Sequence, residues 1–199
     1  MKAVTWLSIL GLLIAVPSAL PAQEGADAYN HGSAGIFVDY FRFSPASTTT
    51  NFVGLGGRAG AHLNRFTQLE GEINYDFARN FTNTFSNGIT TQFVTSRVRP
   101  LTGLFGPKFQ TPGRFKFFVT AKVGFINFTT TTAAVTPGAL GMAFRSVGGS
   151  GTHFAVYPGG GIEGYWGVFG LRAEVGDAIY LNNGTFHNLR MTFGPQFRF

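Results

Sequence analysis

The 199-residue chain has no cysteine and few charged residues, and both absences limit what it can be. Without cysteine, neither a disulfide nor a thiolate metal site can form. Charged residues make up 12% of the chain, about half the usual fraction, so a conventional water-facing surface would be hard to cover. Beyond the first 22 residues, no apolar run approaches the roughly 20 residues that a membrane-spanning helix needs.

Aromatic and glycine residues are abundant instead. The chain contains 23 Phe and 28 Gly, with many Thr and few strong helix formers, a composition that indicates an all-β fold. The formal net charge is +6. Because the basic residues are scattered singly and form no patch or motif, we expect no nucleic-acid partner.

The N-terminal residues are typical of an export signal. Lys2 is followed by an apolar stretch and then by small residues up to Ala22, which is the layout of a cleaved secretory signal peptide. The apolar stretch is too short for a transmembrane anchor. We therefore predict a signal peptide over residues 1–22, a short segment over 23–32 and a single domain over 33–199.

The rest of the chain alternates between apolar and polar residues with the period of a β-strand. In TQLEGEINYDFA, residues 67–78, Leu69 and Ile73 alternate with Glu70 and Glu72. About eight such stretches follow one another. We predict strands over residues 33–43, 51–64, 67–78, 90–109, 115–128, 153–165, 168–180 and 187–199.

Short and longer connections alternate along the chain. The links near 64–66, 110–114 and 165–167 are tight, whereas most of the others are longer and rich in Thr, Asn, Gly and Ser. The other links are SPASTTT (44–50), RNFTNTFSNG (79–88), the long segment 129–151 and LNNGT (181–185). Outer-membrane barrels have short periplasmic turns and longer external loops. The pattern predicts an antiparallel up-and-down eight-stranded transmembrane β-barrel with both ends of its strand series on the periplasmic side.

The polar face of the predicted strands carries ionisable residues of both signs. An eight-stranded barrel is so narrow that side chains fill its interior, where opposite charges would pair. The apolar face would contact lipid, and closure would leave no unpaired strand edge in the bilayer. We predict a lumen charge network of Arg58, Glu70, Glu72, Asp76, Lys108, Lys122, Glu163, Arg172, Glu174, Arg190 and Arg198. A soluble β-sandwich or a lipocalin-like barrel is the alternative.

Aromatic residues near the predicted strand ends suggest girdles at the two membrane interfaces. The residues are Tyr40, Phe41, Phe43, Phe66, Tyr75, Phe77, Tyr165, Trp166, Tyr180 and Phe199.

Three stretches carry a family resemblance: LTGLFGPKF followed by a tight turn and FFVTAKVGF, then GLRAEVGDAIYL, and the final HNLRMTFGPQFRF. With them the chain resembles small OmpA-like outer-membrane β-barrel proteins of Gram-negative bacteria, over essentially all of the chain after the signal peptide. The resemblance implies a location in the cell outer membrane but no activity. It also implies that Phe193, Phe197 and Phe199 form the signal read by the outer-membrane assembly machinery. Pro195 departs from the pattern, because proline has no N–H for the strand ladder.

No local signature of catalysis or metal binding is present. The four histidines are dispersed, so we expect no metal site, and His62 is expected to fill the lumen. Ser–His–acid chemistry needs a hydrogen-bonded arrangement that no motif here predicts. The candidate residues for an enzyme acting on lipid A or phospholipids are Ser146, Ser150, His153, Glu174, Asp177 and His187.

We therefore expect a monomeric barrel with a structural or surface-interaction role and no cofactor. The outer loops, chiefly 129–151, are the expected binding elements for an external ligand. The other expected partners are outer-membrane lipid and lipopolysaccharide, the assembly machinery and, during export, periplasmic chaperones. A lipid-modifying enzyme and a narrow solute channel are the alternatives, although porins use about 16–18 strands to leave an open lumen.

Overall fold

The computed structural model describes residues 31–43, 50–86, 91–132, 151–182 and 184–199. The predicted signal peptide over 1–22 and nearly all of the predicted segment over 23–32 lie outside the described residues. Within the described ranges, no helix is long and apolar enough to cross a membrane.

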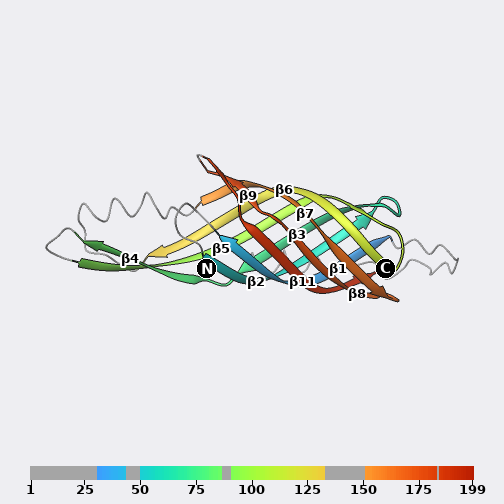
Figure 1. Ribbon diagram of the computed structural model, residues 1–199, viewed down its shortest axis with the longest axis horizontal. Helices are drawn as coiled ribbons and strands as arrows, with labels where there is room; N and C mark the ends of the chain where they lie inside the picture. The colour runs from blue at the N-terminus through green and yellow to red at the C-terminus, as the bar shows by residue number, and fades with distance from the viewer. Residues whose placement is uncertain (1–30, 44–49, 87–90, 133–150, 183) are drawn as a thin grey trace, which may run out of the picture.

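The described residues form one antiparallel sheet that closes on itself (Figure 1). Its strands are β1 (Gly32–Phe43), β2 (Thr50–His62), β3 (Thr67–Asp76), β4 (Arg79–Ser86), β5 (Thr91–Gln110), β6 (Phe115–Thr132), β7 (Gly151–Trp166), β8 (Phe169–Asp177), β9 (Ile179–Leu181), β10 (Thr185–Phe186) and β11 (Leu189–Arg198). The ring runs β1-β2-β3-β5-β6-β7-β8-β11 and returns to β1. The predicted all-β, eight-stranded barrel is therefore confirmed.

The prediction that residues 79–88 form a loop is wrong for residues 79–86, which form β4. β3 and β4 both pair with β5, but the register shifts by one residue between Tyr75↔Leu101 and Arg79↔Val98. The extra residue is a β-bulge, so β3 and β4 are two halves of one long strand. The paired β4 and β5 extend beyond the rest of the barrel, at the left of Figure 1.

Prolines account for the interruptions within the ring. β8 and β9 share one register against β7, but pairing is lost next to Pro158, so the predicted strand over 168–180 is divided at Ala178. The β1–β11 ladder is likewise interrupted opposite Pro195, and the β5–β6 ladder at Pro107, while the register stays the same on both sides. Each proline removes a backbone donor without inserting a residue.

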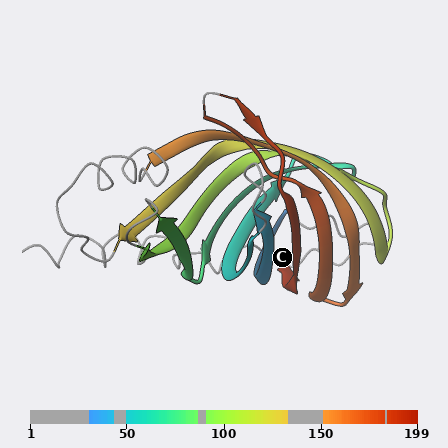
Figure 2. The same ribbon diagram turned by 60° about the vertical axis from the view of Figure 1, so that its left-hand side comes forward.

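The two ends of the barrel differ. At one end, the turn end, β2–β3, β5–β6 and β7–β8 are joined by short turns, and Gly113 and Gly167 have φ values of 112° and 65° that favour glycine. Here Gly32 and Phe199 exchange two backbone hydrogen bonds, of 2.8 and 3.0 Å, which close the seam between the first and last strands. The opposite end, the loop end, carries the remaining connections and the β4–β5 extension (Figure 2).

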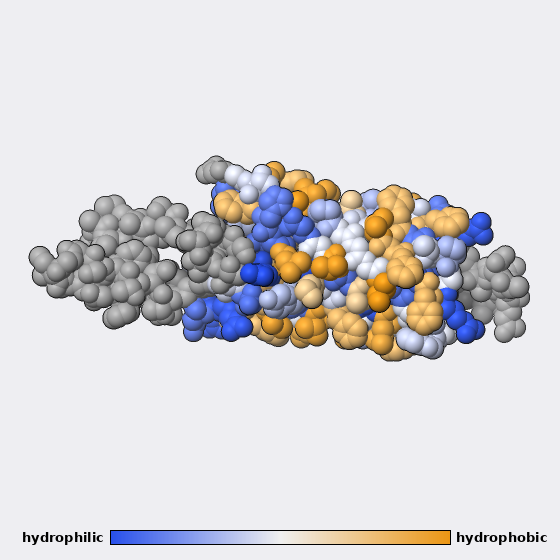
Figure 3. Space-filling view, in the orientation of Figure 1, coloured by the Kyte–Doolittle hydropathy of each residue, from blue (hydrophilic) through white to orange (hydrophobic). Residues whose placement is uncertain are grey.

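The outward face of the barrel is apolar. Its side chains include Ile36, Leu55, Phe117 and Phe193, and Phe117 is 68% exposed. In the view of Figure 3, hydrophobic residues gather over the middle of the barrel, with hydrophilic residues toward both ends. A soluble barrel would lose free energy by exposing so much apolar surface to water, so this face fits a lipid environment.

Candidate functional site: two layers in the barrel lumen

Ionisable side chains fill the part of the lumen nearer the turn end. Five cations and five carboxylates, which we call the charge layer, project inward and are nearly inaccessible to solvent. They are Asp39, Arg58, Glu70, Glu72, Lys108, Lys122, Glu163, Arg172, Glu174 and Arg190. The strand period sets their direction, because each lies on the inward parity of its strand.

Arg172 on β8 contacts three carboxylates of the charge layer. Its guanidinium contacts Glu70 across the lumen on β3, and it lies 3.0 Å from Glu163 and 2.5 Å from Glu174. Lys108 lies 2.6 Å from the same Glu163. The contact between Arg172 and Glu70 joins strands from opposite sides of the ring.

The charge layer continues toward the loop end through Arg190. This side chain lies 2.8 Å from Asp39 and 2.5 Å from Glu72, while Arg58 lies 2.9 Å from Glu174. Every carboxylate of the layer therefore contacts at least one cation. Such pairing offsets the several kcal/mol per ion that desolvation costs.

Three carboxylates of the layer, Glu70, Glu72 and Glu174, are close enough together to ligate one cation. The Lys122 ammonium takes that position, because its Nζ lies 2.7, 2.6 and 3.2 Å from the three groups respectively. The position between the three carboxylates is thus occupied by the chain's own ammonium group, which a metal ion would have to displace.

Aromatic rings lie against the buried guanidinium groups. The Arg58 guanidinium lies 4.2 Å from the ring centre of Phe37, and that of Arg172 lies 4.2 Å from the ring centre of Phe118. Weakly hydrated guanidinium groups stack favourably on aromatic faces, so these rings supply part of the interaction energy that water would otherwise provide.

The charge layer differs from the predicted lumen network at three residues: Arg198, Asp76 and Asp39. Arg198 lies at the turn end, where it donates to the Gly167 carbonyl at 2.7 Å and lies over Tyr165, so it is not part of the charge layer. Asp76 is buried and accepts from Asn74 at 3.3 Å. Sequence reasoning missed Asp39, although it is the single acidic residue on the aromatic parity of β1.

The lumen nearer the loop end is filled by apolar and aromatic side chains. We call this cluster the aromatic layer. It consists of Phe41, Phe52, Leu104, Ile126, Phe128, Ala155, Tyr157, Ala178 and Tyr180, with Phe43, Val98 and Phe186 packed against it. The rings of Phe128 and Tyr180 are 5.4 Å apart in an edge arrangement, and those of Tyr180 and Phe186 are stacked at 5.0 Å.

The aromatic layer corrects the predicted interfacial girdles. Phe41, Phe43, Tyr165 and Tyr180 lie on inward parities, and all but Phe43 are buried. The remaining predicted girdle residues with large exposed rings are Phe66, Tyr75, Phe77, Trp166 and Phe199. The prediction of outward-facing rings fails at these residues because the inward positions of one strand change from charged to aromatic along its length.

Among the described residues, two of the enzyme candidates come together: Asp177 lies 2.5 Å from His187 Nδ1 in an exposed pair. Glu174, in contrast, is held in the charge layer. His153 packs near the rings of Phe128 and Tyr180. Ser146 and Ser150 lie outside the described residues. His62 is half-buried at the turn end.

The predicted assembly residues Phe193, Phe197 and Phe199 all point outward and are more than half exposed. The rings of Phe197 and Phe169 lie 5.5 Å apart on neighbouring strands.

No protein-family model and no curated protein sequence matches this chain. Solved structures do. The attachment invasion locus protein Ail of Yersinia pestis, in complex with the heparin analogue sucrose octasulfate, is 13% identical with a TM-score of 0.56, over 85% of this chain and 99% of Ail.

Two further structures have the same fold. Neisserial surface protein A is 8% identical with a TM-score of 0.57, over 85% of this chain and 97% of that protein. The outer membrane protein OprG of Pseudomonas aeruginosa is 11% identical with a TM-score of 0.51, over 86% and 97% respectively. This chain therefore has the fold of the small eight-stranded outer-membrane β-barrels.

Proposed function

We propose that the protein is an integral outer-membrane barrel with a structural or surface-interaction role, with the turn end in the periplasm and the loop end outside the cell. The observation that carries the proposal is the division of one closed sheet into an apolar outer face and a charge-filled lumen. Closure of the sheet provides hydrogen-bond partners for backbone N–H and C=O groups, which lipid cannot provide. Outer-membrane lipid and lipopolysaccharide, the assembly machinery and periplasmic chaperones are the partners that this location implies.

The two lumen layers argue against a channel role. Lys108 and Lys122 are fully buried, and so are Phe52 and Ile126 in the aromatic layer. An ion entering from outside would first meet an apolar constriction, which opposes wetting, and would then have to separate buried ion pairs. We expect no steady conductance from the purified protein in planar bilayers.

Cell fractionation and gel mobility test the location. We expect the protein in the outer-membrane fraction, with an unheated sample that migrates differently from a boiled one because the closed barrel resists detergent. Recovery in the soluble periplasm, with identical mobility before and after boiling, would overturn the proposal.

The loop end carries the proposed surface interactions, and residues 129–151 are its chief candidate. Residues 129–132 are the end of β6 and residue 151 begins β7, so a deletion should be confined to 133–150. We expect this variant to keep its heat-dependent mobility and to lose adhesion of expressing cells to a host-cell or matrix surface. Unchanged adhesion would remove this segment as the binding element.

The C-terminal strand is the proposed assembly signal. Removing Phe199 deletes both backbone hydrogen bonds with Gly32, whereas Arg198→Gln removes side-chain contacts to Gly167 and Tyr165 and leaves the backbone intact. We therefore expect the truncated protein to accumulate less in the outer membrane than R198Q does, as measured by the heat-shifted fraction. Normal assembly of both variants would contradict the role of Phe199.

An enzymatic role is the remaining alternative. We expect no change in lipid A or phospholipids, so mass spectra of lipids from cells with and without the protein should be identical. A reproducible loss or gain of an acyl chain would instead direct attention to the exposed Asp177–His187 pair.

A further inference from the structure

The acidic and basic side chains are distributed very differently between lumen and exterior. Of the seven Asp and Glu residues in the described ranges, six are buried in the lumen, and Asp177 is the seventh. Of the thirteen Lys and Arg residues there, five are buried and six are exposed, while Lys116 and Arg198 are half-buried over the Tyr165 ring. Exposed basic side chains of the described barrel therefore far outnumber exposed acidic ones, while the buried charges are nearly balanced.

Three of the exposed cations lie on outward parities near the loop end: Arg42 on β1, and Arg97 and Arg99 on β5. Asn51 on β2 pairs with Arg42, and its carbonyl accepts from Arg79 Nε at 3.1 Å. Arg79 itself pairs with Val98, which packs against the aromatic layer, so it does not belong to this outward group.

Within the described ranges, the arginine group has no carboxylate partner of its own. Asp177 lies two strands away from Arg42, with Leu189 between them. Its two oxygens already contact His187 at 2.5 Å and the Asn188 N–H at 2.9 Å. The group spans three strand spacings from β1 to β5, about 14 Å, which is wider than one phosphate.

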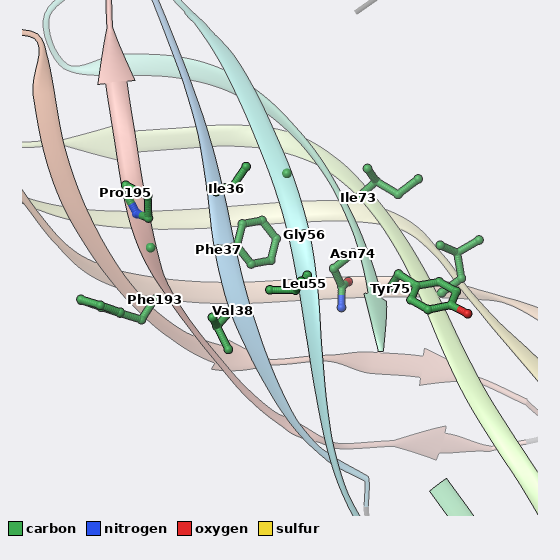
Figure 4. A pocket seen from close by; sticks show the side chains of 13 residues that line it. Ile36, Phe37, Val38, Leu55, Gly56, Ile73, Asn74, Tyr75, Phe193 and Pro195 are labelled. Atoms are coloured by element: carbon green, nitrogen blue, oxygen red, sulfur yellow. The ribbon is translucent and has the colours of Figure 1, made fainter. Parts of the chain in front are cut away.

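An apolar groove of about 640 Å³ lies on the outward face of the same strands. It is bounded by side chains of β1, β2, β3, β5 and β11 (Figure 4). Residues that define it include Ile36, Val38, Leu55, Tyr75 and Phe193. Gly57 forms part of its floor, and a methyl group there would meet only the Gly35 carbonyl oxygen, at 3.9 Å.

The arginines and the groove are continuous. The Arg99 guanidinium lies 5.2 Å from the ring centre of Tyr75, which lines the groove. Arg42 follows Val38 by four residues on β1, a rise of about 13 Å. A headgroup held by the arginines would thus place its hydrocarbon chain in the groove.

We propose that this face is a binding site for a multiply phosphorylated, acylated lipid of the outer leaflet, with its phosphates on the arginines and an acyl chain in the groove. The proposal rests on the membrane location proposed above. Guanidinium groups bind phosphate oxygens in bidentate fashion, and a groove that faces hydrocarbon accepts an acyl chain without desolvating polar atoms. A zwitterionic phospholipid has no net charge to match several uncompensated arginines.

The test uses the full protein reconstituted in nanodiscs, with lipid retention measured by native mass spectrometry. The probes are diphosphoryl lipid A, monophosphoryl lipid A and phosphatidylethanolamine. We expect the wild-type protein to prefer diphosphoryl lipid A, and the R42Q/R97Q/R99Q variant to bind it about tenfold more weakly, a loss of about 1.4 kcal/mol. R65Q/R114Q, which removes exposed arginines at the turn end, is the control and should retain the preference.

A second pair of variants tests the groove. G57L places a side chain in the groove and should reduce retention of diphosphoryl lipid A, whereas A59L changes an exposed position on the same strand outside the groove and should not. Heat-dependent mobility shows that each variant has folded, and R97Q alone replaces any multiple variant that has not.

Three outcomes would overturn the site. The first is equal lipid binding by the wild-type protein and R42Q/R97Q/R99Q. The second is equal loss in the turn-end control. The third is binding of sucrose octasulfate through the same arginines with no effect of G57L, which would indicate a soluble polyanion. A wild-type protein that fails to enter membranes would instead refute the proposed function itself.

Discussion

The charge layer and the aromatic layer fill the same lumen by opposite chemistry. In the charge layer, stability depends on partners: Lys122 is tolerable only because three carboxylates surround it. In the aromatic layer, Phe52 and Ile126 are stabilised by close packing against neighbouring apolar side chains and require no specific partner. Removing a partner in the first layer leaves an unpaired ion, whereas removing a ring or methyl group in the second leaves a cavity.

The difference shows how a narrow barrel can be sealed without a conventional core. In the proposed membrane location, lipid covers the outer face, and apolar burial in the lumen occurs where strands bring large rings together. Elsewhere, ion pairs cross-link strands that are far apart in sequence, such as β3 and β8 through Glu70 and Arg172. Three sets of variants would sharpen or break this comparison.

Arg172→Met should have the largest effect. It leaves Glu70, Glu163 and Glu174 short of a cation, and breaking a buried pair by removing one partner costs about 3–5 kcal/mol. Urea unfolding in detergent micelles would measure the loss in free energy of unfolding. R198M removes a guanidinium outside the charge layer and should cost less than about 1 kcal/mol. Similar losses for both variants would mean that the charge layer does not stabilise the fold.

Ile126→Ala should have the next largest effect. Ile126 is completely buried in the aromatic layer, and the cavity should lower the free energy of unfolding by about 2–4 kcal/mol. Its matched control is V123A, three residues earlier on the outward face of β6, where lipid can fill the space. If V123A is as destabilising as I126A, the assignment of inside and outside on β6 is wrong.

Lys108 and Glu163 should show the smallest effect, as a coupling energy. Their contact of 2.6 Å is buried, so K108M, E163Q and the double variant should give a coupling of about 0.5–3 kcal/mol. The double variant should be more stable than the sum of the two single changes predicts. Strict additivity in the same unfolding assay would show that the pair contributes no specific interaction.

The alternation of apolar and polar residues predicted most of the barrel, because side chains of a β-strand point to opposite faces at successive residues. This alternation assigned the inward direction of Arg58, Glu70 and Lys122 correctly. It missed β4, because a bulge shifts the register after Asp76 and the Thr- and Asn-rich sequence suggested a loop. It also divided the inward and outward aromatics wrongly at Phe41 and Tyr180, since ring size alone does not say which side of a strand is packed.

The sequence by itself determined the all-β class, the alternation of faces and the set of ions available for the lumen. Only the tertiary structure decided which ions meet. Arg58 and Glu72 are register neighbours on β2 and β3, yet Arg58 contacts Glu174 on β8. Which ions pair depends on the curvature and closure of the ring. Curvature and closure place strands that are distant in sequence face to face across the lumen, and no local sequence pattern predicts which strands these are.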